Sequence, residues 1–345
     1  MLDFLKNYLS TLLILIIAYF AYTLSSLNYF FIKDIYILWT SINTLDIYKS
    51  IILSYAILLI PFYYKFNFIK SKSRIVITFL LKKCTFNNAR FTSIEHQAIL
   101  SLLVKLFFAP LMILFFASQV WTVLNNLKYS FNDIWLISNN FILFFNNNLF
   151  WLVFSILFFI DIIFYLIGYL IEIPKSKHVI KTVDATFLWW FVALICYPPF
   201  NTYTTNIIWW YSIDFPVFSN IYVHLALNIL ILILLVIYAS SSLALWFKAS
   251  NLTNRWIVTT GVYKYIRHPA YIAKNLTWWI WWLPILILNY SISNYKTFFI
   301  ILFSLLAWSF IYYLRAITEE RHLSLDKDYL AYKNKVKYKF IPWVF

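Results

Sequence analysis

A short stretch near the C-terminal end of the chain gathers side chains that can bind charged ligands. Arg267 and His268 stand directly before Pro269, and a proline in that position favours the first turn of a new helix. The two side chains should therefore lie at a helix N-terminus, where free backbone amides and the helix dipole favour an anion such as a carboxylate. Tyr271 follows in the first turn.

A second polar group follows one apolar hairpin later. Arg315, Glu319 and Glu320 come at the end of an apolar stretch of membrane length, and Arg315 and Glu319 are four residues apart on one helical face. Carboxylates at this point can bind an ammonium or sulfonium group. Either motif alone is also typical of a membrane anchor or an ordinary helix pair. The two motifs together, separated by a hairpin, favour a shared site beside the bilayer.

Glycine is rare in this chain, and its position is informative. Gly261 is one of only two glycines and precedes the Arg-His-Pro stretch by six residues. Because glycine adopts backbone conformations that other residues avoid, Gly261 predicts a tight turn or a close approach of the backbone to a ligand.

The elements that position these groups are membrane helices. The chain is 345 residues long, 63% hydrophobic and 12% charged, with a mean hydropathy of +0.76, which is typical of a polytopic membrane protein. A span needs about 20 mainly apolar residues. On that basis the sequence predicts an all-α integral membrane protein with eight spans and a cytoplasmic C-terminal helical tail. The predicted spans are residues 8–31, 47–64, 97–121, 149–171, 185–199, 219–247, 271–289 and 295–314.

The basic residues predict the orientation of these spans. Most of the 28 Lys and Arg residues fall in the links 65–96, 174–183 and 248–270 and in the tail from residue 315. Cytoplasmic links carry such an excess, so we expect both termini in the cytoplasm, in a multi-pass protein of the bacterial inner membrane. The net charge of +15 therefore reflects topology, and no nucleic-acid partner is expected. We expect no metal site, because Cys84 and Cys196 have no neighbouring metal-ligand spacing.

Some polar residues fall inside the predicted spans. Asp161 lies near the middle of the fourth span, and His224 and Asn228 lie one turn apart on the sixth. They would form a relay or line a substrate cavity, or else be paired within the bundle. Lys105 is expected to extend to the cytoplasmic interface. The apolar run between Lys72 and Lys82 fits either an amphipathic helix on the membrane surface or a plain loop.

The order of the C-terminal motifs resembles a known family of membrane enzymes. The pattern G-x-Y-x-x-x-R-H-P-x-Y, an apolar hairpin, R-x-x-x-E-E-x-x-L, Y-x-x-Y and I-P is similar to that of the isoprenylcysteine carboxyl methyltransferases and their bacterial phospholipid methyltransferase-like relatives. The resemblance covers about residues 251–345. Its residues are Gly261, Tyr263, Arg267, His268, Pro269, Tyr271, Arg315, Glu319, Glu320, Leu323, Tyr329, Tyr332, Ile341 and Pro342.

The resemblance implies an S-adenosylmethionine-dependent methyltransferase that acts on a hydrophobic or lipid-like acceptor. It implies cofactor contacts from His268, Tyr271, Glu319 and Glu320, and a catalytic role for Arg267, Arg315 and Glu319. The methyltransferase-like core would occupy residues 248–345 and an N-terminal membrane bundle residues 1–247. The acceptor would be the carboxylate of a prenylcysteine-type substrate or a phospholipid headgroup.

Two other functions remain open on the sequence alone. A membrane reductase of the sterol-reductase type resembles the same C-terminal region and uses NADPH, although the Glu-Glu pair after the Arg-His-Pro motif favours the methyltransferase. A non-catalytic transporter or assembly protein would instead use Asp161 and His224 as its pathway residues and would need no cofactor.

Overall fold

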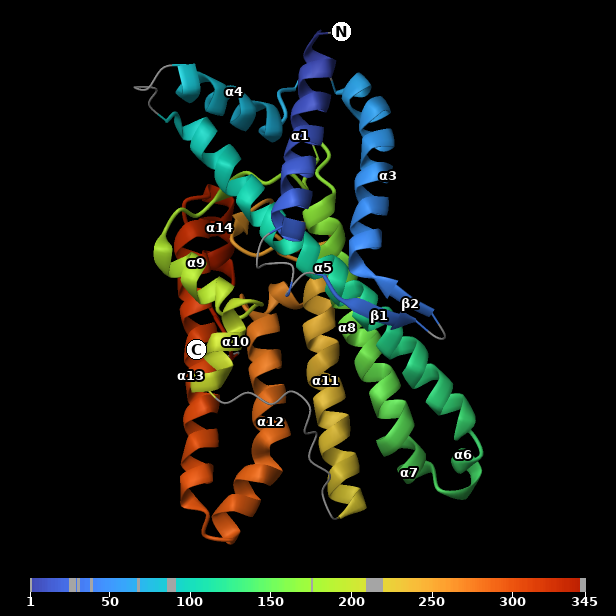
Figure 1. The fold of residues 1–345 in the computed structure, drawn as a ribbon. Helices are drawn as coiled ribbons and strands as arrows, with labels where there is room; N and C mark the ends of the chain where they lie inside the picture. Colours follow the sequence, from blue (N-terminus) through green and yellow to red (C-terminus); the bar gives the residue numbers. More distant parts are fainter. Residues whose placement is uncertain are drawn as a thin grey trace. The chain divides into compact units, whose positions relative to one another are not determined.

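A computed structural model of the chain is almost entirely helical (Figure 1), which confirms the prediction of an all-α integral membrane protein. In the residues that the structure describes, four strands form two short antiparallel two-stranded sheets. The structure describes residues 2–24, 29, 32–37, 40–66, 69–85, 91–174, 176–208 and 220–341.

The contacts divide the chain into two compact units, and each unit is built from separated stretches. Unit 1 comprises Met1–Ser118, Leu166–Ala185 and Ser250–Trp256. Unit 2 comprises Gln119–Tyr165, Thr186–Ala249 and Ile257–Phe345. All six candidate site residues therefore belong to unit 2.

Unit 1 combines long helices with both small sheets. The pair of β1 and β2 aligns Ile35 with Ile42, and α4 packs against α1. Helix α4 coincides with the apolar run that follows Lys72, and it buries Ser73, Val76 and Phe79, which confirms a helix there. The elements are α1 (Leu2–Leu24), β1 (Asp34–Ile37), β2 (Thr40–Asn43), α3 (Thr44–Lys65), α4 (Lys72–Thr85), the first part of α5 (Ser93–Asn132), β3 (Thr182–Val183) and β4 (Thr253–Asn254).

Unit 2 contains the helices that carry the candidate site. In Figure 1, helices α11, α12 and α13 stand next to one another in chain order, and α9 packs on α13. The elements are α6 (Leu136–Asn139), α7 (Phe141–Phe144), η1 (Phe145–Leu149), α8 (Phe150–Leu170), whose last turn belongs to unit 1, α9 (Phe187–Leu194), α10 (Phe200–Ile207), α11 (Ile221–Leu245), η2 (Trp246–Lys248), η3 (Gly261–Lys264), α12 (Pro269–Ser291), α13 (Tyr295–Leu323) and α14 (Lys327–Lys335).

Six of the described helices are long and apolar enough to cross a membrane, so the chain is a multi-pass membrane protein. They correspond to the first, second, third, fourth, sixth and eighth predicted spans. The seventh corresponds to α12, whose 23 residues are long enough to cross. Its tryptophans and polar residues make it less apolar than the six, so its crossing stays a prediction, as does the cytoplasmic placement of the termini.

The fifth predicted span, residues 185–199, is wrong as a membrane-length helix. Helices α9 and α10 have eight residues each, about 12 Å at 1.5 Å per residue, whereas the hydrocarbon core is about 30 Å thick. Pro198 and Pro199 lie between them, and proline ends a helix because it lacks the amide donor. The link predicted after this span lies partly outside the described residues.

The hairpin of α12 and α13 brings the two polar motifs to the same end of unit 2. Pro269 starts α12, and the side chain of Asn294 caps α13 by accepting a hydrogen bond from the amide of Thr297. Between these ends the helices pack through a core of Trp282, Leu286, Ile301 and Leu305. The antiparallel packing places the last turn of α13 beside the first turn of α12.

Gly261 lies in a tight turn, as the sequence predicted. Its φ angle is +62°, and a Cβ added there would lie 3.2 Å from the Cβ of Ala244 on α11. Both the left-handed backbone and the close contact disfavour a side chain at this position. The glycine thus lets the link after α11 turn tightly against that helix before it reaches Arg267.

Candidate functional site

The first candidate residues lie at the start of α12, as the sequence predicted. His268 is the residue that precedes the helix and Pro269 is its first residue. The backbone amides of Arg267 and His268 donate to the carbonyls of Tyr338 and Lys339, each over 3.0 Å. The C-terminal tail is therefore paired with the Arg-His dipeptide and fixes where both side chains leave the backbone.

Glu320 is the centre of the charged cluster. Arg267 donates from Nε to Glu320 Oε1 over 2.7 Å, and His268 Nε2 lies 3.1 Å from the same oxygen. Lys333 and Lys339 approach the other oxygen at 3.5 and 3.8 Å. The Glu320 side chain is only 6% exposed. This carboxylate therefore joins α12, α13, α14 and the tail.

The charge of Glu320 is stabilised by these partners. Helix α13 has 29 residues, about 43 Å, so its last turns extend beyond a hydrocarbon core of about 30 Å. Burial favours the neutral acid, but the hydrogen bonds from His268 and Arg267 outweigh it and lower the pKa of Glu320 from 4.5 to about 2. Glu320 is thus an ionised carboxylate whose oxygens are already engaged within the protein.

Glu319 has a different environment, although it is the neighbouring residue. Tyr271 donates its hydroxyl hydrogen to Glu319 Oε2 over 2.7 Å, and His268 Nδ1 lies 3.8 Å from the same oxygen. The side chain of Glu319 is 31% exposed. The rings of His268 and Tyr271 stack with centroids 5.3 Å apart. Glu319 is therefore a half-exposed carboxylate beside two stacked rings, with room for a further partner.

Arg315 lies one turn before Glu319 and faces aromatic rings. Its side chain is buried, and its guanidinium carbon lies 5.3 Å from the ring centre of Tyr271 and 4.9 Å from that of Tyr312. Such cation–π contacts stabilise a buried charge by roughly 0.5 to 2 kcal/mol. The structure thus brings all six predicted site residues together, and Arg315 sits on the membrane side of the group.

The tail motif holds the site together. Tyr329, Tyr332 and Val336 form a buried cluster, and the Tyr332 hydroxyl donates to the carbonyl of Tyr263 over 2.8 Å. Arg267 donates from one terminal nitrogen to the carbonyls of Val336 and Lys337, over 2.7 and 2.6 Å. Ile341 is exposed and Pro342 lies outside the described residues. Sequence reasoning missed these carbonyls, because a backbone acceptor has no sequence signal.

Asp161 and His224 do not lie together. Asp161 accepts hydrogen bonds from Tyr238 and Ser242 on α11, whereas His224 lies 3.3 Å from Asn228 near the start of the same helix. Fourteen residues separate His224 from Tyr238, which is about 21 Å along a helix. A direct relay between Asp161 and His224 is therefore wrong. Asp161 lies on α8 and binds the C-terminal part of α11, the part that leads to the site.

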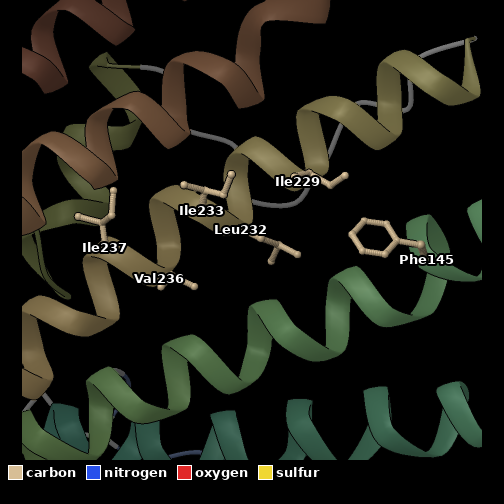
Figure 2. Close-up of a pocket in the computed structure, with 6 residues that line it drawn as sticks. All are labelled: Phe145, Ile229, Leu232, Ile233, Val236 and Ile237. Atoms are coloured by element: carbon tan, nitrogen blue, oxygen red, sulfur yellow. The ribbon is translucent and has the colours of Figure 1, made fainter.

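Figure 2 shows a cavity of about 390 Å³ on unit 2, between α11 and η1. Only apolar side chains line it: Phe145, Ile229, Leu232, Ile233, Val236 and Ile237. Ile233 and Val236 are about half exposed, so in a bilayer this groove faces lipid. In the described parts of the chain, no three His, Cys, Asp or Glu side chains group so as to hold a metal ion.

Comparison with known proteins finds a family that this region resembles. Residues 200–336 match a family described as a protein of unknown function, DUF1295. The match covers less than half of the chain but includes α11 to α14 and all six candidate residues. This family falls among membrane proteins that resemble steroid reductases and methyltransferases. No curated protein and no solved structure matches the chain.

Proposed function

We propose that the chain is an integral-membrane methyltransferase that uses S-adenosylmethionine and acts on a hydrophobic or lipid-like acceptor. The observation that carries the proposal is the direct contact of the two polar motifs. Arg267 and His268 bind Glu320, while Tyr271 binds Glu319. Residues about 50 positions apart in sequence thus form one polar group at the end of two membrane-length helices.

The residues present suit the charges of the cofactor. S-adenosylmethionine supplies a methyl group on a sulfonium sulfur, and it also carries an amino group and a carboxylate. Glu319 would bind the amino group, because it has one close hydrogen bond and is partly exposed. The first amides of α12 would bind the carboxylate, since the N-terminal turn of a helix has no internal acceptor for them. Glu320 supports this pocket by fixing Arg267 and His268.

The same residues would orient the acceptor rather than activate it. A carboxylate or thiolate acceptor needs no general base, so holding it in line with the transferred methyl group supplies most of the acceleration. Arg315 lies beside Tyr271, where a guanidinium would attract an anionic acceptor. The membrane helices would admit a lipid-like acceptor from the bilayer, either a prenylcysteine-type carboxylate or a phospholipid headgroup.

The reductase remains the second candidate, because the matched family falls among proteins that resemble both classes. The two differ in cofactor, so binding separates them. Purified protein in detergent should bind S-adenosylhomocysteine and show no saturable binding of NADPH. The opposite preference would favour the reductase, and binding of neither would favour a non-catalytic protein.

Activity itself can be tested without knowing the acceptor. Purified protein is incubated with methyl-labelled S-adenosylmethionine and total lipid, and the products are extracted with organic solvent. We expect the label in the organic phase. Label found only in water-soluble products would rule out a lipid-like acceptor. If the protein binds the cofactor but transfers no label, the lipids supplied do not contain its acceptor.

A further inference from the structure

A further cationic side chain of unit 2, Lys274, lies beside the site, and no motif accounts for it. Lys274 follows Tyr271 by three residues, so both lie on one face of α12. Its ammonium lies 5.5 to 5.7 Å from the ring centres of Tyr238, Trp278 and Tyr312. These rings come from α11, α12 and α13, so Lys274 points into the space between three helices.

Lys274 is held differently from Lys105, a half-buried lysine in the interior of α5. Lys105 on α5 lies 2.5 Å from the carboxylate of Glu172. Among the described residues, no carboxylate lies within 4.0 Å of the Lys274 ammonium. A charge in the membrane region is costly and is normally paired. Aromatic faces offset only part of that cost.

Asp161, an acidic side chain that interacts with the charge of Lys274, is already engaged. Asp161 accepts hydrogen bonds from the hydroxyls of Tyr238 and Ser242, and through Tyr238 it fixes one of the rings against Lys274. Tyr312, another ring beside Lys274, also contacts Arg315, whose guanidinium carbon lies 4.9 Å from the ring centre. Among the described residues, Asp161 and Glu319 are the carboxylates around Lys274 and Arg315, and each already accepts a tyrosine hydroxyl. The Lys274 ammonium thus has no close carboxylate of its own in this part of the chain and can attract an anion.

Lys274 is connected by aromatic contacts to the residues that we assign to the cofactor. Its neighbour Tyr312 packs edge-on against Tyr271, with ring centroids 5.5 Å apart, and the Tyr271 hydroxyl binds Glu319. Two aromatic side chains, Tyr312 and Tyr271, therefore connect Lys274 to the carboxylate assigned to the cofactor. An anion beside Lys274 would lie near the cofactor and among the membrane helices.

We propose that Lys274 binds the anionic group, a carboxylate or a phosphate, of the hydrophobic acceptor. The aromatic rings around the half-buried Lys274 hold its ammonium in place and shield it from part of the surrounding water, which strengthens its attraction for an anion. Binding of the anion follows from this cluster alone, whereas its role as acceptor rests on the proposed methyl transfer. Lys274 is then a specificity residue that selects charged amphiphiles over neutral ones.

Binding of matched amphiphiles tests the site without any methyl transfer. Radiolabelled oleate is compared with oleyl alcohol, and dioleoyl phosphatidic acid with dioleoylglycerol, on the purified full chain in detergent. We expect at least one anionic member to bind about ten-fold more tightly than its neutral partner at a saturable site. Preference within the first pair only identifies a carboxylate ligand, and preference within the second only a phosphate.

Variants of Lys274 assign that preference to this side chain. Lys274→Met should abolish the preference, and Lys274→Arg should retain most of it, while both leave S-adenosylhomocysteine affinity unchanged. The control is Lys296→Met, since Lys296 is an exposed lysine in the first turn of α13. Equal binding of charged and neutral amphiphiles by the wild type, or an unchanged preference in Lys274→Met, overturns the proposal. Anion preference in a protein that binds no S-adenosylhomocysteine would overturn the methyltransferase function but leave the anion site.

Discussion

Two largely buried carboxylates, Glu172 in unit 1 and Glu320 in unit 2, are held in similar ways. Glu172 lies 2.5 Å from both Lys72 and Lys105 and accepts a hydrogen bond from the amide of Ile180 over 3.0 Å. Burial opposes its charge, but the two ammonium groups lower its pKa from 4.5 to about 2. Glu320 reaches a similar pKa through Arg267 and His268.

The difference lies in what stands beside each carboxylate. Glu172 joins the start of α4, the middle of α5 and the link after α8, and its oxygens are used in doing so. Glu320 has Glu319 next to it, a carboxylate that is 31% exposed and bonded to a single tyrosine hydroxyl. A buried carboxylate with all its partners is thus a structural tie in both units. What distinguishes the proposed binding site in unit 2 is Glu319, a neighbouring carboxylate that has few partners.

The largest predicted effect is a loss of folding stability when Glu172, the buried carboxylate of unit 1, is replaced. Glu172→Gln leaves Lys72 and Lys105 without a counter-charge, and breaking a buried ion pair in this way costs about 3 to 5 kcal/mol of folding free energy. Thermal unfolding in detergent should show a clearly lower midpoint than the wild type. Affinity for S-adenosylhomocysteine, measured on the folded fraction, should not change. An unchanged midpoint would mean that Glu172 is not a structural tie.

A slightly smaller loss of stability is expected at Glu320, because Lys333 is 41% exposed and can turn to solvent. Glu320→Gln should cost about 3 kcal/mol by leaving Arg267 buried without its partner. The double variant Arg267→Met with Glu320→Leu should recover most of that stability, since an apolar pair replaces an ionic one. Failure of the double variant to recover would show that Arg267 acts mainly through the tail carbonyls.

Acid should weaken the ion pairs of both Glu172 and Glu320, but gradually and only at low pH. A carboxylate whose folded pKa is lowered stabilises the fold above its unfolded pKa, and the stabilisation is lost as pH falls through the folded value. For Glu172 and Glu320 that window runs from pH 4.5 down to about 2, with up to about 3 kcal/mol from each. The unfolding midpoint of the wild type should fall across this window, and that of Glu320→Gln should fall less. Equal acid sensitivity would contradict the low pKa of Glu320.

The side of the membrane on which Glu172 and Glu320 lie can be tested without changing either residue. Both are predicted to face the cytoplasm, whereas α10 should lie toward the far side. In a Cys84→Ser background, cysteines at the exposed positions Lys177 and Asn334 should be shielded from an impermeant thiol reagent in intact cells, and a cysteine at Asn206 should be labelled. Labelling of only one of the first two would show that the sites face opposite compartments.

Some of this arrangement could be predicted because it follows from local rules. Proline chemistry located the start of α12 at Pro269, and an apolar hairpin requires that its two ends meet. The pairing of Arg267 with Glu320 and of Tyr271 with Glu319 could not be predicted, since it depends on how the tail around Tyr338 pairs with the chain. That pairing is set by contacts between residues distant in sequence.

Other features depend on contacts of the same kind. Lys105 was expected to extend to the cytoplasmic interface, which stays a prediction, and its partner there, Glu172, is a carboxylate 67 residues later, 2.5 Å from its ammonium. The fifth span was predicted from its apolar composition, although its 15 residues are short and end in Pro198 and Pro199. An apolar segment packed against protein, as α9 is against α13, has the same composition as one that faces lipid.

Titration of S-adenosylhomocysteine into purified wild type, Glu319→Gln and Glu172→Gln tests the central claim most directly. If Glu319 binds the cationic end of the cofactor, its replacement removes a charge-assisted hydrogen bond of about 1.5 to 3 kcal/mol. Affinity should then fall by roughly ten- to a hundred-fold in Glu319→Gln and stay unchanged in Glu172→Gln. Equal affinity in all three proteins, or no binding by the wild type, would contradict the assignment of this site to the cofactor.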